Sequence, residues 1–174
     1  MLRQTALIVF AATASIWNVA VADERLVPLA ISGNWIAMAH RQSITSRADV
    51  CMVANMKSGF AIRVDETTKQ IRVIDDHWSL PSGATGTVTI TIGDWHQVFD
   101  IDDNTSDSVN AEIDPDVLTD MLNWMDKATS MSVTVGKAKP FLVPLAGSTR
   151  ATNAFMTCAG IKGHVGTPGS NPLE

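Results

Sequence analysis

The sequence predicts a mainly β fold, either β-sandwich-like or α+β, made of antiparallel strands and two helices. Short runs rich in β-branched residues recur along the chain and are separated by turn residues, which is typical of strands joined to their neighbours by turns. Two other segments, near residues 114–129 and 148–159, place apolar residues at helical spacing. The length of 174 residues allows one domain with a true hydrophobic core.

The first half of the chain contains four segments that we predict as strands. After an extended lead-in, residues 34–39 and 51–56 are short apolar runs separated by a polar loop. Residues 60–64 and 70–74 alternate with period two on either side of a short turn, which predicts a hairpin. Residues 78–83 are predicted as a loop, because a proline within them cannot donate a ladder hydrogen bond.

The strongest strand signal lies in residues 87–92, which alternate Thr with Val or Ile. Branching at Cβ favours extended backbone and packs well on a pleated surface. Gly93 and Asp94 follow as a two-residue loop with glycine first, as a type II′ turn requires. Residues 95–101 are therefore predicted to return as the partner strand of a second hairpin.

Asp114 marks the start of the first predicted helix. Asp114 has the character of an N-cap, Pro115 suits the first helical position, and Asp116 interacts favourably with the helix dipole. One apolar stripe continues to residue 128, so this helix is expected to lie on a sheet. Its members are Val117, Leu118, Met121, Leu122, Trp124, Met125 and Ala128. Two further strands are predicted at 131–135 and 141–143.

A second helix is expected to close the domain. We place its N-cap at Ser148, its buried face at Ala151, Phe155 and Cys158, and its end at Gly160. Together the patterns predict about seven or eight strands with one amphipathic helix late in the chain and another at its end.

Residues 1–22 have the features of a secretory signal peptide. Arg3 supplies the positive start, an apolar run follows, and Ala20-Val21-Ala22 is a small-x-small site, so we expect cleavage after Ala22. The apolar run is shorter than the ~20 residues that span a bilayer, and no stable membrane insertion is expected. We predict a periplasmic or secreted protein with a single β-rich domain over 23–162 and a flexible tail over 163–174.

Two cysteines, Cys51 and Cys158, follow the predicted cleavage site. An even number of cysteines in an exported chain favours a disulfide. Neither cysteine adjoins a histidine, an arginine or a glycine-rich turn that would activate a thiol. The two residues are 107 positions apart, so the predicted bond ties the beginning of the domain to its end.

The chain is acidic, with a net charge of −5 and a pI near 5.2. Removal of residues 1–22 takes away Arg3 and leaves a net charge of −6. No basic excess is available to neutralise phosphates, which excludes a typical nucleic-acid binder. Eight acidic residues and no lysine or arginine occur from Asp100 to Asp120, and we predict a solvated acidic connection ahead of the first helix.

Three segments could supply metal ligands. Residues 75–77 (Asp-Asp-His) and 94–96 (Asp-Trp-His) place carboxylates near an imidazole, a ligand set that zinc or copper could use. Residues 100–111 match alternate ligand positions of a calcium loop, but Thr105 and Ala111 replace its turn glycine and its bidentate carboxylate. No metal or other cofactor is predicted, and a periplasmic Cu/Zn-binding protein remains an alternative.

No set of catalytic residues is recognisable in the sequence. Ser148 follows Gly147 but lacks the second glycine of a nucleophile elbow. The acidic residues crowd one segment instead of forming two separated carboxylates. We therefore predict that the protein is not an enzyme.

The order of these elements resembles a known family. The chain resembles the invasion-associated locus B family of exported bacterial proteins. The resemblance is carried by Gly33-Asn34-Trp35, the strand at Cys51, the run Ile71–Pro81 and the stretch Pro144–Ala151, which leads to a final cysteine. The resemblance covers roughly Gly33 to Cys158. It implies a non-enzymatic, β-rich periplasmic or secreted protein connected with host-cell interaction in alphaproteobacteria, and it carries over no catalytic residues.

We expect a protein-binding surface at the end of the second hairpin together with the acidic residues that follow it. An exposed tryptophan beside polar residues is a typical anchor of a protein interface. The predicted binding residues are Asp94, Trp95, His96, Asp100, Asp102 and Asp103. The expected function is an exported protein-binding module with a role in host interaction or virulence. A specific alternative is an inhibitor of c-type lysozyme or another cell-wall hydrolase, because lysozyme is basic and an acidic surface accelerates its association.

Overall fold

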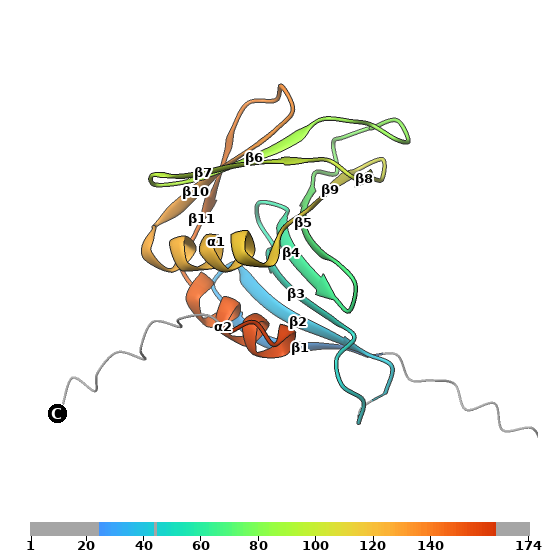
Figure 1. The fold of residues 1–174 in the computed structure, drawn as a ribbon, viewed down its shortest axis with the longest axis vertical. Helices are drawn as coiled ribbons and strands as arrows, with labels where there is room; N and C mark the ends of the chain where they lie inside the picture. The colour runs from blue at the N-terminus through green and yellow to red at the C-terminus, as the bar shows by residue number, and fades with distance from the viewer. Residues whose placement is uncertain (1–24, 44, 163–174) are drawn as a thin grey trace, which may run out of the picture.

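The computed structural model describes residues 25–43 and 45–162 and has the predicted mainly β fold. Two antiparallel sheets and two helices make up this part of the chain (Figure 1). The predicted signal peptide at 1–22 and the predicted tail at 163–174 lie outside the described residues. No helix among the described residues is long and apolar enough to cross a membrane.

The larger sheet has seven strands in the order β1-β2-β3-β4-β5-β9-β8. Its first five strands follow the chain as successive hairpins, and β9 and β8 join later from the far edge of β5. The strands are β1 (Arg25–Ser32), β2 (Trp35–Arg41), β3 (Val50–Asn55), β4 (Phe60–Asp65), β5 (Lys69–Ile74), β8 (Asp103–Asn104) and β9 (Ser108–Glu112).

The smaller sheet has four strands in the order β11-β10-β6-β7, comprising β6 (Thr87–Ile92), β7 (Trp95–Asp100), β10 (Ser130–Val135) and β11 (Phe141–Pro144). The predicted hairpin of β6 and β7 is confirmed, with Gly93 at φ +58 and Asp94 at negative φ, the sign pattern of a type II′ turn. In Figure 1, helix α2 (Ser148–Ala159) lies against β1–β3, and helix α1 (Pro115–Lys127) lies between α2 and the smaller sheet.

Helix α1 has the predicted start and the predicted buried stripe. The Asp114 carboxylate accepts a hydrogen bond from the Asp116 amide at 2.8 Å, and Pro115 opens the helix. Its fully buried residues are Leu118, Met121, Leu122 and Met125. The stripe contributes to one core that also contains the largest buried aromatic side chains, Trp35, Phe60 and Phe155.

Gly147, and not Ser148, is the N-cap of α2, so the predicted N-cap is wrong. Gly147 has φ +86, and Ser148 is the first helical residue and only 1% exposed. The chain enters the helix through the left-handed backbone of Gly147, and only glycine fits at this position, because a Cβ would lie 2.6 Å from the Ser32 carbonyl oxygen. The predicted end of α2 at Gly160 is confirmed.

The acidic connection predicted to be solvated contains a buried strand. Four of the five residues of β9 are buried, and β9 pairs with β5 on one side and with β8 on the other. Val109, Ala111 and Ile113 alternate along this segment and face the core, whereas the acidic residues on either side, Asp107 and Glu112, are exposed. The solvated-loop prediction is therefore wrong for β9. Strand β1 likewise forms where only an extended lead-in was predicted.

One backbone carbonyl of the smaller sheet accepts hydrogen bonds from side chains of the larger sheet. The Pro144 carbonyl, at the end of β11, accepts hydrogen bonds from Trp35 Nε1 at 2.8 Å and from Asn55 Nδ2 at 3.2 Å. Trp35 and Asn55 are register partners on β2 and β3, and both are buried. The Trp35 ring also packs edge-to-face on Phe60, with ring centroids 6.4 Å apart.

The predicted disulfide between Cys51 and Cys158 is confirmed. It joins β3 to the last turns of α2 with a Cα–Cα distance of 5.9 Å. Cys51 is buried and Cys158 is half-buried, so α2 is fixed covalently to the sheet on which it lies.

Replacement of Gly147 by alanine should lower the free energy of unfolding by about 2 kcal/mol or more, because backbone strain and a collision with Ser32 add together. Gly136→Ala is the matched control. Gly136 has φ +54, but a methyl group added at this position would meet only open space, so strain alone should cost about 1 kcal/mol. Urea unfolding measures the free energy of unfolding of both variants. An equal decrease in the two variants would contradict the collision with Ser32.

Replacement of both cysteines by alanine should lower the free energy of unfolding by about 2–5 kcal/mol, because the bond closes a long loop in the unfolded chain. Urea unfolding with and without reductant checks this. Reductant should bring the wild type close to the double variant and leave the variant unchanged. A variant as stable as the oxidised wild type would refute the prediction.

Candidate functional site

A candidate site is a groove between strand ends of the larger sheet and the β10–β11 hairpin of the smaller sheet. One wall is the turn between β3 and β4, a second is the end of β5 with the loop after it, and a third is the β10–β11 hairpin. The groove has a volume of about 860 Å³, within the usual range of ligand-binding clefts. Its main lining residues are Met56, Ser58, Ile74, Trp78, Phe141 and Leu142.

Large apolar side chains that are unusually exposed gather in this groove. Met56 is 60% exposed, Ile74 42% and Leu142 68%. They are three of the six large apolar side chains that are exposed among the described residues. Trp78 and Phe141 lie beside them, half-buried against the core. Contiguous exposed apolar surface with polar surroundings is typical of interaction sites.

The turn between β3 and β4 is held in one shape. The Asn55 side-chain oxygen accepts hydrogen bonds from the amides of Lys57 and Ser58, each at 3.1 Å. Gly59 has φ +69, and a Cβ there would collide with the Ile74 carbonyl. The Ile74 amide donates to the Gly59 carbonyl at 2.9 Å. The first two walls of the groove are therefore fixed to each other.

The groove also contains polar groups. Ser58 Oγ is buried and has no hydrogen-bond partner among the described residues. Lys57 and Lys139 lie on the walls, and Asp75, Asp76 and His77 lie at one side. A buried hydroxyl without a partner is unfavourable, so Ser58 is an unsatisfied polar group in the groove wall.

The structure brings Asp75, Asp76 and His77 together, as the sequence alternative for a metal site requires. His77 Nδ1 lies 3.0 Å from an Asp75 oxygen and 2.8 Å from an Asp76 oxygen. Each of the three residues offers one ligand atom, and these three atoms all lie within 4.8 Å of one another. The hydrogen bond with Asp75, followed by the charges of Asp76 and Asp75, raises the pKa of His77 above its ordinary value. The three groups form an exposed ion-pair cluster that could also ligate a divalent cation.

The predicted binding residues fall into two separate patches. Asp94 and His96 are exposed and Trp95 is half-buried against the core, all at the hairpin end of β7. The exposed Asp100, Asp102 and Asp103 lie at the other end of β7. At about 3.3 Å per residue, the two ends of this strand are roughly 17 Å apart. The structure therefore does not unite these six residues in one patch.

Sequence reasoning missed the groove because its walls come from three distant parts of the chain. The sequence patterns single out only Asp75, Asp76 and His77 among its lining residues, and as metal ligands. One available signal was the outward position of Ile74, which the alternation of β5 places on the face opposite Ile71 and Val73. Ser148, the serine considered as a nucleophile, is buried and does not line this groove.

No protein-family model, curated protein or solved structure matches the chain.

An NMR titration of His77 should give a pKa above that of an ordinary exposed histidine. The raised pKa means that the ion-pair cluster stabilises the fold fully below the ordinary pKa of histidine and loses this effect as the pH rises through the raised value. Asp75→Asn should return the pKa of His77 toward its ordinary value, and Asp76→Asn should lower it less. An unchanged pKa in Asp75→Asn would exclude the assigned cause.

Proposed function

We propose that the protein is an exported, non-enzymatic protein-binding module whose groove takes an extended apolar segment of its partner. The observation that carries this proposal is the gathering of Met56, Ile74 and Leu142, all exposed, beside Trp78 and Phe141. Full burial of one large aliphatic side chain contributes about 1.5–3 kcal/mol. Several such side chains around one groove supply the apolar centre that protein interfaces need, with charged groups at its rim.

The export part of the proposal rests on two features. The Cys51–Cys158 disulfide fits an oxidising compartment, and residues 1–22 have the composition of a signal peptide. We place the protein in the periplasm or outside the cell, where a role in host interaction or virulence is the one that the family resemblance implies.

Leu142→Asp should weaken peptide binding at least about tenfold, because it puts a charge into the apolar groove. Val98→Asp is the matched control, since Val98 is 52% exposed on β7 and does not line the groove. A phage-displayed random peptide library selected on the wild type provides the probes. Their affinities for the three proteins can be measured by isothermal titration calorimetry.

The expected result is enrichment of peptides with an apolar centre that bind the wild type and Val98→Asp alike. Thermal unfolding of both variants checks that each remains folded. Failure to enrich any peptide, or equal loss of binding in both variants, would reject the groove as the binding site.

An inhibitor of c-type lysozyme is a second candidate, favoured by one specific observation. Asp100, Asp102 and Asp103 are exposed together at one end of β7 and could attract a basic enzyme. Lysozyme activity at low salt should fall on addition of the wild type and fall less on addition of the triple Asp→Asn variant. Unchanged activity with the wild type would reject this candidate.

A Cu/Zn-binding function is a third candidate, favoured by the closeness of the ligand atoms of Asp75, Asp76 and His77. Calorimetric titration of the wild type and of His77→Ala with Zn²⁺ and Cu²⁺ tests it. Stoichiometric binding that depends on His77 would support a metal site beside the groove, and absence of binding would eliminate it.

A further inference from the structure

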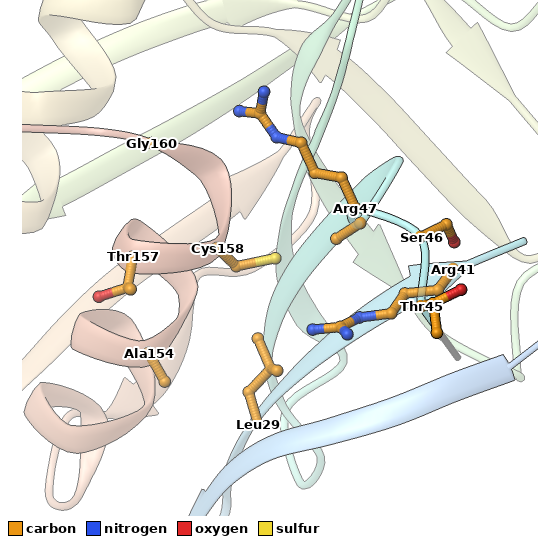
Figure 2. A pocket seen from close by; sticks show the side chains of 10 residues that line it. Leu29, Arg41, Thr45, Ser46, Arg47, Ala154, Thr157, Cys158 and Gly160 are labelled. Atoms are coloured by element: carbon orange, nitrogen blue, oxygen red, sulfur yellow. The ribbon is translucent and has the colours of Figure 1, made fainter. Parts of the chain in front are cut away.

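A second pocket, separate from the groove, lies between β1, the loop joining β2 to β3, and the C-terminal half of α2 (Figure 2). Its volume is about 620 Å³. We call it the arginine pocket, after Arg41 at the end of β2 and Arg47 in the loop. Its apolar wall consists of Leu29 from β1 and of Ala154 and Cys158 from α2.

The arginine pocket is cationic in an acidic protein. Its lining includes two arginines and no acidic residue, although the whole chain has a net charge of −5. Two arginines elsewhere have partners: Arg63 pairs with Asp65 at 2.9 Å, and Arg72 Nε donates to Asn110 at 2.6 Å. Within residues 25–43 and 45–162, neither Arg41 nor Arg47 forms an ion pair.

Arg41 has a specific unmet requirement. Its Nε is buried and has no acceptor among the described residues, and a buried charged donor without an acceptor is costly. Figure 2 shows the Arg41 side chain extending across the pocket toward α2, beside Leu29. Arg47 is exposed and directs its guanidinium away from Arg41, on the side of Gly160. Arg41 is therefore the inner cation and Arg47 the outer one.

Two of the three hydroxyl groups that line the pocket are already engaged as donors. Ser46 Oγ donates to the Ser43 carbonyl at 2.8 Å, and Thr157 Oγ1 donates to the Asn153 carbonyl at 2.9 Å. The C-terminal carbonyls of α2 could in principle accept from the arginines, but no such hydrogen bond occurs in the described part of the chain. Among the described residues, the two guanidinium groups have no ion-pair partner, and their natural partner is an oxyanion.

We propose that the arginine pocket binds a small organic anion, with its carboxylate or phosphate held by Arg41 and its apolar part placed against Leu29, Ala154 and Cys158. Arg47 attracts the anion at the mouth of the pocket. This combination of a half-buried cation with an apolar wall selects an amphipathic ligand over both an inorganic ion and a neutral alcohol.

Three probes of equal chain length test the proposal: hexanoate, hexyl phosphate and hexan-1-ol. Amide chemical shifts of the full chain give the binding site and the affinity by NMR. Hexanoate or hexyl phosphate should shift the resonances around Arg41 and Ala154 and bind at least about tenfold more tightly than hexan-1-ol. The stronger of the two anions identifies the preferred headgroup. Equal binding of the alcohol, or no shifts with either anion, would overturn the proposal.

Arg41→Met keeps the aliphatic stem and removes the charge, and it should weaken anion binding at least about tenfold. Arg47→Met should weaken binding less and reduce its dependence on salt, as expected of an outer cation.

Lys137→Met is the control, because it makes the same change of charge at an exposed site in the β10–β11 turn. If Lys137→Met weakened binding as much as Arg41→Met, the effect would be one of net charge and the assigned site would be wrong. If Arg41→Met fails to fold, Arg41→Lys replaces it, because lysine keeps the charge without the planar guanidinium. An affinity of Arg41→Lys below that of the wild type but not abolished would support direct contact between Arg41 and the anion.

Discussion

The two hydrogen bonds to the Pro144 carbonyl hold the end of the smaller sheet against the larger sheet. Trp35 and Asn55 are buried, and their side-chain N–H groups need acceptors inside the protein. The Pro144 carbonyl satisfies both. It thereby fixes the end of β11 against β2 and β3, just before Gly147 caps the N-terminus of α2. The position of α2 in turn brings Cys158 to Cys51.

The same constraint shapes the surface. Pro144 lines the groove, so the hydrogen bonds that join the sheets also hold one wall of the groove in place. Two smaller hollows border Cys158 at the C-terminal end of α2. One is the arginine pocket, and the other is a cavity of about 270 Å³ whose lining includes Asp49, Asp65 and Glu66. Arg47 and Cys158 border both. Basic and acidic side chains therefore line neighbouring hollows, although the net charge of the protein suggests a uniformly acidic surface.

The sequence predicted those helices and strands that are defined by residues close together in the chain. The β6–β7 hairpin and helix α1 follow from alternation, a glycine-first turn and an N-cap, all within a few residues of the element they define. Strand β9 was missed because its acidic neighbours outweighed the alternation of Val109, Ala111 and Ile113. Gly147 was not recognised as the N-cap of α2 because the contact that requires glycine there is with Ser32, far away in the sequence. The groove and the arginine pocket both combine segments that only the fold brings together, so the local patterns did not predict either.

The disulfide also divides the molecule in a topological sense. Cys51 and Cys158 close a covalent ring, and every residue that lines the groove, from Met56 to Pro144, belongs to that ring. A single backbone cut by a protease inside the ring would leave both fragments linked, and the groove would keep all its parts in one molecule. Arg41 and Arg47 lie outside the ring, on the segment that precedes it. A cut between Arg47 and Cys51 would sever them from the ring covalently, so the two sites differ in how they would survive proteolysis outside the cell.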